Sequence, residues 1–157
     1  EKMKKLLLMA LIVGTLFGAT MELPKDASCL IRKIKVYLAP EWAATIQVRS
    51  GEVIYFSTPK SMFEFYFQSG RWPEFQVKHN DDMRVHVTNY NTLQKIPAKE
   101  AYYVYGSKKT SPAGDDLPAF SSQKEAEAFA KKFDGKRVLD FAGVSEGLIN
   151  LLNNRLR

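Results

Sequence analysis

Alternating apolar and polar positions between Trp42 and Arg49 predict the first strand of this chain. The turn Ser50-Gly51-Glu52 leads into a second apolar run at 53–56, which indicates a hairpin. Thr58 and Pro59 then have the residue types of a helix cap and first helical position. The apolar residues after them recur at helical spacing: Met62, Phe63, Tyr66 and Phe67. We interpret this aromatic face as core, with partner docking through Phe65 and Trp72 as the alternative.

The second half of the chain shows the same order of elements. Residues 101–105 form an aromatic and β-branched run typical of a strand, and a polar loop follows at 106–118. Ser122 and Glu125 have the spacing of a capping box, which predicts a helix that ends before Gly135. A short strand is expected at 136–141, and Ser145 begins a terminal helix.

A near-repeat links the two halves. Phe56-Ser57-Thr58-Pro59-Lys60 is matched 64 residues later by Phe120-Ser121-Ser122-Gln123-Lys124, and Phe129 matches Phe65 at the same offset. Chance is the alternative, because hydroxyl caps before helices are common. We predict an α+β fold in which two repeated ββαβ units pack together and a C-terminal helix follows. The expected boundaries are a signal peptide at 1–19, an irregular N-terminal segment at 20–41, units at 42–90 and 101–141, and the C-terminal helix at 142–157.

Residues 1–19 are typical of a secretory signal peptide. A basic start, Met3-Lys4-Lys5, precedes an uncharged apolar run that ends in small residues near Ala19. An uncleaved anchor is the alternative, but the run is shorter than the ~20 residues of a membrane span. We therefore expect a periplasmic or otherwise exported protein that meets a membrane only if the leader is not cleaved. Without the leader, the net charge falls from +6 to +4 and no basic cluster accompanies a nucleic-acid motif, so nucleic acid is not an expected partner.

The chain has a single cysteine, Cys29, so it cannot form an intrachain disulfide. The thiol could be a buried apolar group, a redox thiol, half of an intermolecular disulfide or a metal ligand. With two histidines and no Ser-His-Asp arrangement, the sequence offers little for catalysis, and we do not expect an enzyme.

Several segments together resemble the NosL family, the nitrous oxide reductase accessory proteins. The similarity is carried in the first half by Pro40-Glu41-Trp42-Ala43-Ala44 and Lys60-Ser61-Met62-Phe63, and in the second half by 101–107, 111–120, 125–130 and 135–139. The resemblance spans roughly residues 29–141. It implies two ββαβ units and an exported copper(I)-binding protein that serves maturation of a copper enzyme.

The chain departs from this family at the residues that would hold copper. The family typically carries Cys-x-x-Cys-Gly-Met, and by this resemblance Cys29 falls on the first Cys, Arg32 on the second, Lys33 on the Gly and Ile34 on the Met. Ala113 falls on a Met of the second-half loop. Copper(I) prefers thiolate and thioether ligands, so Cys29 alone predicts weak binding. Among substitute ligands, Met21 is the best candidate, since it lies near Cys29 in sequence and outside any core pattern. For Met62, Met83, His79 and His86, we favour an ordinary core or surface role over metal binding.

The leading hypothesis is an exported NosL-like accessory protein for maturation of a copper enzyme of the nitrous oxide reductase type. It would act by binding a protein partner, with weak or altered copper(I) binding. The alternative is a functional copper(I) chaperone that uses Cys29 together with ligands outside the family pattern.

Overall fold

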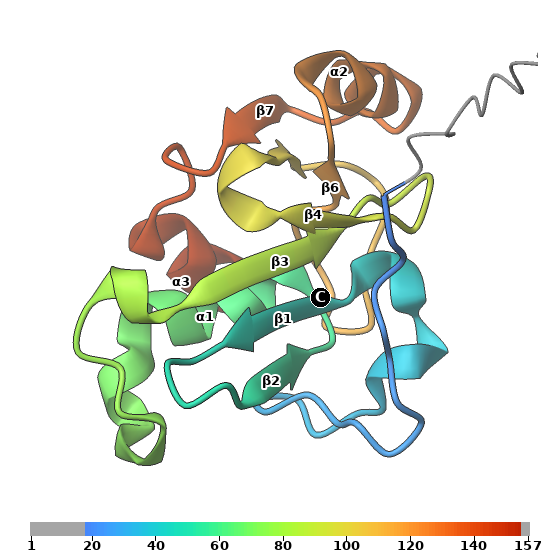
Figure 1. Ribbon diagram of the computed structural model, residues 1–157. Helices are drawn as coiled ribbons and strands as arrows, with labels where there is room; N and C mark the ends of the chain where they lie inside the picture. The colour runs from blue at the N-terminus through green and yellow to red at the C-terminus, as the bar shows by residue number, and fades with distance from the viewer. Residues whose placement is uncertain (1–17, 155–157) are drawn as a thin grey trace, which may run out of the picture.

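The computed structural model describes residues 18–154 of the 157-residue chain and contains two antiparallel sheets. The larger sheet has the strand order β2-β1-β3-β4 (Figure 1), and the smaller sheet has the order β6-β5-β7. The strands are β1 (Ala44–Gln47), β2 (Val53–Phe56), β3 (Arg84–Thr88), β4 (Lys95–Pro97), β5 (Tyr102–Tyr105), β6 (Ala119–Phe120) and β7 (Arg137–Asp140). The helices are α1 (Pro59–Gln68), α2 (Gln123–Lys132) and α3 (Glu146–Asn154). Short 3-10 helices span Val36–Leu38, Pro40–Trp42, Ser69–Arg71, Pro73–Phe75, Asn80–Asp82 and Ala98–Glu100.

The two halves share one topology, as the near-repeat predicts. In each half the first strand pairs with both others, β1 with β2 and β3, and β5 with β6 and β7. The matched phenylalanines are buried and in contact within each unit, with ring centroids 5.7 Å apart for Phe56–Phe65 and 4.9 Å for Phe120–Phe129. The expected α+β fold with two ββαβ units and a C-terminal helix is therefore confirmed.

Both unit helices begin where the hydroxyl caps predict. The Thr58 Oγ1 atom accepts the Ser61 N–H at 3.2 Å, and Pro59 takes the first helical position, where its missing N–H costs nothing. Ser122 and Glu125 form the reciprocal capping box. The hydroxyl signals therefore locate both helix starts.

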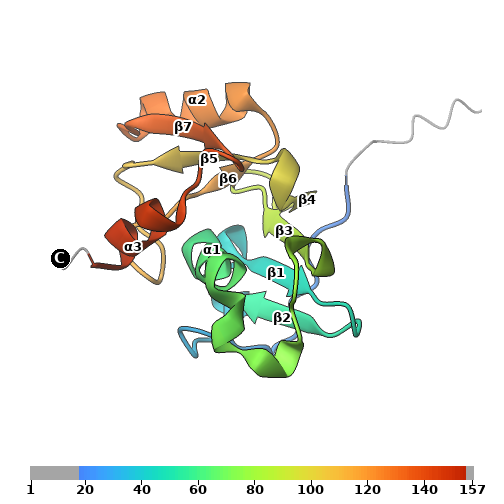
Figure 2. The same cartoon turned by 90° about the vertical axis from the view of Figure 1, so that its left-hand side faces the viewer.

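Helix α1 lies between the two sheets, which explains why so many of its side chains are apolar. Figure 2 shows α2, the smaller sheet, the α1–α3 layer and the larger sheet one above another. Phe63 packs edge-on to Tyr103 of the smaller sheet with centroids 5.2 Å apart. Phe65 is fully buried and packs on Trp72, so this pair belongs to the core rather than to a docking surface.

The two units also exchange helix-start contacts. Asp116, from the loop before β6, accepts the Lys60 N–H of α1 at 2.8 Å. Asn89, directly after β3, donates its side-chain amide to the Ser121 hydroxyl just before α2 at 2.8 Å. Each unit thus completes the start of the other unit's helix.

The connector predicted at 90–99 contains an additional strand, β4, at the edge of the larger sheet. Pro97 lacks an N–H, which is tolerated in an edge strand but not in a central one. Pro97 is therefore compatible with a strand here, because β4 lies at the edge of the larger sheet.

The predicted leader lies outside the described residues except for Gly18 and Ala19. The Ala19 carbonyl accepts the Lys95 N–H at 2.9 Å, and Thr20 bridges to Gln94, so this segment starts beside β4. Among residues 18–154, no helix has the length and apolar character to cross a membrane.

Candidate functional site

The loop that carries Cys29 is a tight hairpin. The Cys29 N–H donates to the Ile34 carbonyl at 2.8 Å, and the Lys33 N–H donates to the Cys29 carbonyl at 2.9 Å. Lys33 adopts a left-handed backbone with φ of 62°, a conformation that favours glycine. The thiol is 1% exposed within the apolar core, and its Sγ accepts the Arg32 N–H at 3.3 Å. Of the roles open to Cys29, the geometry favours a buried apolar side chain.

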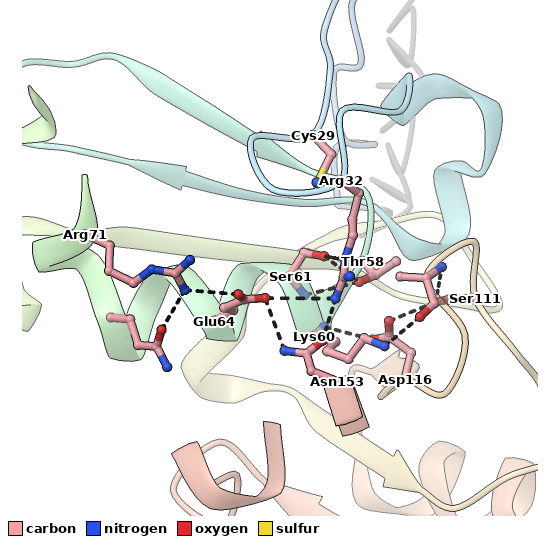
Figure 3. A network of polar contacts seen from close by, with 12 residues as sticks. Cys29, Arg32, Thr58, Lys60, Ser61, Glu64, Arg71, Ser111, Asp116 and Asn153 are labelled. Atoms are coloured by element: carbon pink, nitrogen blue, oxygen red, sulfur yellow. Dashed lines mark hydrogen bonds and ion pairs between the residues drawn. The ribbon is translucent and has the colours of Figure 1, made fainter. Parts of the chain in front are cut away.

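Arg32 extends from this hairpin onto α1 and α3. Its Nε donates to the Ser61 hydroxyl at 3.3 Å, and its Nη2 donates to the Asn153 carboxamide oxygen (Figure 3). The same nitrogen lies 3.9 Å from Glu64 Oε2. Arg32 therefore ties three separate segments of the chain together.

Glu64 is the acceptor shared by the polar side chains around Arg32. It accepts hydrogen bonds from the Asn153 amide and from Arg71, each at 3.2 Å. Its side chain is only 15% exposed, so its attraction to Arg32 is less screened than at an open surface. Glu64 is thus shared between two guanidinium groups, Arg71 at 3.2 Å and Arg32 at 3.9 Å.

Lys60 connects the cluster to the second-half loop. Its side chain is buried, and its Nζ donates to the Ala113 carbonyl at 2.6 Å. Burial lowers the Lys60 pKa, the nearby charge of Asp116 opposes that shift, and the charge of Arg32 adds to it. Arg32 and Lys60 are therefore two cations close enough to disfavour each other.

Asp116 balances this positive charge from the other unit. Its carboxylate accepts from the Lys60 N–H, the Leu117 N–H at 2.9 Å and the Ser111 hydroxyl at 2.9 Å (Figure 3). Burial raises the Asp116 pKa, whereas the Leu117 and Lys60 N–H groups and the Lys60 charge oppose that shift. The carboxylate is fully occupied by groups of this chain.

The structure brings together most of the positions that the resemblance assigned to copper. Cys29 and Arg32 lie on one side of the start of α1, and Ala113 is reached from the same helix through Lys60. Ile34 is the partner of Cys29 across the hairpin, but its side chain is 36% exposed. Arg32 and Ala113 therefore both contact the first turn of α1, through Ser61 and Lys60 respectively.

Met21 lies at a different place, against the larger sheet. Its Sδ accepts the Thr45 hydroxyl at 3.8 Å. Thr45 pairs with His86 and alternates with the core-facing Ala44 and Ile46, so its side chain is on the opposite face of the sheet. The contacts of Cys29 and Met21 therefore give no shared site for these two sulfur atoms.

Met62, Met83 and His86, which were also considered as substitute ligands, have surroundings that account for them without a metal. Met62 and Met83 are buried in the core. The His86 pKa is lowered by burial first and then by the charges of Lys95 and Arg84. Among the described residues, no group of three or more His, Cys, Asp or Glu side chains has a geometry that could hold a metal ion.

Sequence reasoning missed the polar partners that fill this site. Lys60 carried a signal, since a lysine in the first turn of an otherwise apolar, buried helix needs a counter-charge. Asp116 and Asn153 gave no such signal, because only the packing of the second unit and of α3 brings them to α1. An open surface cleft of about 670 Å³ lies elsewhere, lined by residues such as Arg49, Glu74 and Asp82 of both charges.

Comparison with known proteins places the fold and the family. The NosL family model matches residues 20–149, which is most of the chain. No curated protein matches the chain significantly. A crystal structure of the copper chaperone NosL from Shewanella denitrificans is similar in fold, with a TM-score of 0.67 and 18% sequence identity over 82% of this chain and 97% of that one. The chain therefore belongs to the NosL family.

Proposed function

We propose that this protein is an exported accessory factor for maturation of a copper enzyme of the nitrous oxide reductase type. It acts by binding a protein partner, and its own copper(I) affinity is weak. Membership of the NosL family, whose members are accessory proteins and not enzymes, supports a copper-related accessory role and the expectation that the chain is not an enzyme. Export, the partner enzyme and weak copper binding are proposals that rest on the leader pattern, on the family resemblance and on the site, respectively.

The position of Arg32 is the observation that supports weak copper(I) binding. A copper(I) site needs two or three soft ligands that converge on one point. In this chain the second-Cys position holds a guanidinium bonded to Ser61 and Asn153, and the neighbouring Lys60 ammonium adds a second positive charge. Among the five positions that the resemblance assigns to the copper motif, Cys29 is thus the one soft ligand, and a guanidinium occupies the position of the second thiol.

An anaerobic copper(I) titration of the purified protein against a competing chelator tests this proposal. The expected result is that the protein removes no stoichiometric copper(I) from bicinchoninate. The combined variant Arg32→Cys, Ile34→Met, Ala113→Met should gain tight 1:1 binding, and Arg32→Gln serves as the control that removes the cation without adding a ligand. Circular dichroism of each variant checks that the fold is kept.

Two outcomes would contradict the proposal in different ways. Tight binding of one copper(I) by the unmodified monomer, abolished by Cys29→Ser, supports the alternative of a functional chaperone. Tight binding that survives Cys29→Ser but is lost in Met21→Leu places the site on the other face of the larger sheet.

A further inference from the structure

We propose that residues 33–38, here called the loop face, are a preformed docking surface for an acidic protein partner and that docking there requires no bound metal. The inference rests on the proposed accessory function and names the surface that serves it. It follows from three properties of the loop: exposed apolar side chains, a rigid base and an excess of positive charge.

Exposed apolar side chains are concentrated in the loop face. Six large hydrophobic residues are exposed among the described residues, and three of them fall within these positions: Ile34 at 36%, Tyr37 at 39% and Leu38 at 68%. Single exposed apolar residues are ordinary, but a concentration of them marks an interaction site. Tyr37 belongs to the aromatic residue types that are enriched in protein interfaces.

The base of the loop face is held rigidly. Cys29 and Val36 are each 1% exposed in the core, and the Val36 N–H donates to the Ala27 carbonyl at 3.1 Å. Arg32 fastens the same hairpin to α1 and α3. A surface fixed in advance loses little conformational entropy on binding. Because Arg32 is a permanent part of the chain, this shape does not depend on metal.

The charge of the loop face selects an acidic partner. Lys33 and Lys35 are exposed on either side of Ile34. The guanidinium of Arg32 instead bonds to Ser61 of α1 and Asn153 of α3. Carboxylates around an apolar centre are the complementary surface. Anionic membranes typically attract clusters of about four to eight Lys or Arg residues, so two lysines favour a protein over a lipid surface.

Site-specific photocross-linking of the full-length protein in its host tests the proposal. A benzoylphenylalanine replaces Leu38, and the same group at Leu93, exposed to 38%, is the control. We expect a protein cross-link at Leu38 at least about tenfold stronger than at Leu93, within an acidic segment of the partner. The double change Lys33→Glu, Lys35→Glu should reduce that cross-link by about tenfold, whereas Lys99→Glu, Lys124→Glu should not. A copper(I) chelator should leave the yield unchanged.

Each contrary outcome overturns the inference. Equal cross-links at Leu38 and Leu93, no cross-link, or a partner segment without acidic residues excludes the docking surface. Cross-links to a second copy identify self-association, and binding of the purified protein to phosphatidylglycerol vesicles that requires Lys33 and Lys35 identifies a membrane surface. A yield that falls with chelator excludes metal independence. The copper titration is separate, so tight copper binding with an unchanged Leu38 cross-link contradicts the proposed weak affinity alone.

Discussion

Removal of the Asp116 carboxylate should destabilise the protein more than any change at an exposed carboxylate. Asp116 is 4% exposed and accepts hydrogen bonds from two backbone N–H groups and one hydroxyl. In Asp116→Ala, the Lys60 and Leu117 N–H groups lose their acceptor while they stay buried. Each unsatisfied group costs about 1–3 kcal/mol.

The Lys60 ammonium raises this cost. It stays buried on its carbonyl partner, Ala113, but loses the carboxylate that most opposes the lowering of its pKa. Because these effects overlap, we expect about 3–5 kcal/mol of lost unfolding free energy, the range for breaking a buried charged network. Asp116→Asn keeps one acceptor oxygen but turns an NH₂ toward donors, so its cost should be smaller.

Urea unfolding followed by far-ultraviolet circular dichroism measures these free energies. Asp26→Ala, at an exposed aspartate, is the control and should change stability by about 0.5 kcal/mol or less. In a double-mutant cycle, Asp116→Ala with Lys60→Met should lose less than the sum of the two single changes, by roughly 1–3 kcal/mol. An Asp116→Ala loss below about 1 kcal/mol with an unchanged urea slope, or a cycle without coupling, would refute the reasoning.

Three further predictions concern stability and use the same assay. Phe56→Ala and Phe120→Ala should each cost about 3–5 kcal/mol, because both rings are fully buried; a loss in only one would contradict their equivalence. Lys33→Gly should stabilise by roughly 0.5–1 kcal/mol by relieving its left-handed backbone, whereas Lys35→Gly, where φ is −69°, should destabilise. His86 has a folded pKa below its ordinary 6.5, so the unfolded chain binds the proton first and stability should fall as pH decreases below about 6.5. His86→Gln should remove that part of the pH dependence, and an unchanged profile would count against it.

The sequence predicted the local features of the fold because local physics decides them. The Thr58 and Ser122 caps depend on hydroxyls within three residues of the N–H groups that they accept. The phenylalanine pairs follow from periodicity and from one repeated offset. Strand β4 was not predicted, because a proline argues against a strand unless that strand is known to lie at the edge of its sheet.

The candidate site was predictable only in part. The resemblance located Cys29, Arg32 and Ala113, and in the structure Arg32 bonds to Ser61 and the Ala113 carbonyl bonds to Lys60, both in the first turn of α1. The partners of Arg32 could not be predicted, because Glu64 of α1 and Asn153 of α3 lie 89 residues apart in sequence. Met21 was favoured for its nearness in sequence, yet it packs against Thr45. Residues that are close in sequence can lie on opposite faces of a sheet, so nearness in sequence does not imply a shared site.

Loss of copper ligands need not cost this fold its stability. In small metal-dependent domains, the binding energy of the metal is the folding energy. Here one cluster of buried apolar side chains has members from Cys29 near the start of the chain to Leu152 near its end. The two units also complete each other's helix starts through Asp116 and Asn89. The hairpin that would carry a metal is held by Arg32 bonds to α1 and α3. Replacement of a thiol by a guanidinium thus removes a soft ligand while it keeps the loop in place. A surface displayed by that loop can therefore serve a partner whether or not copper is bound.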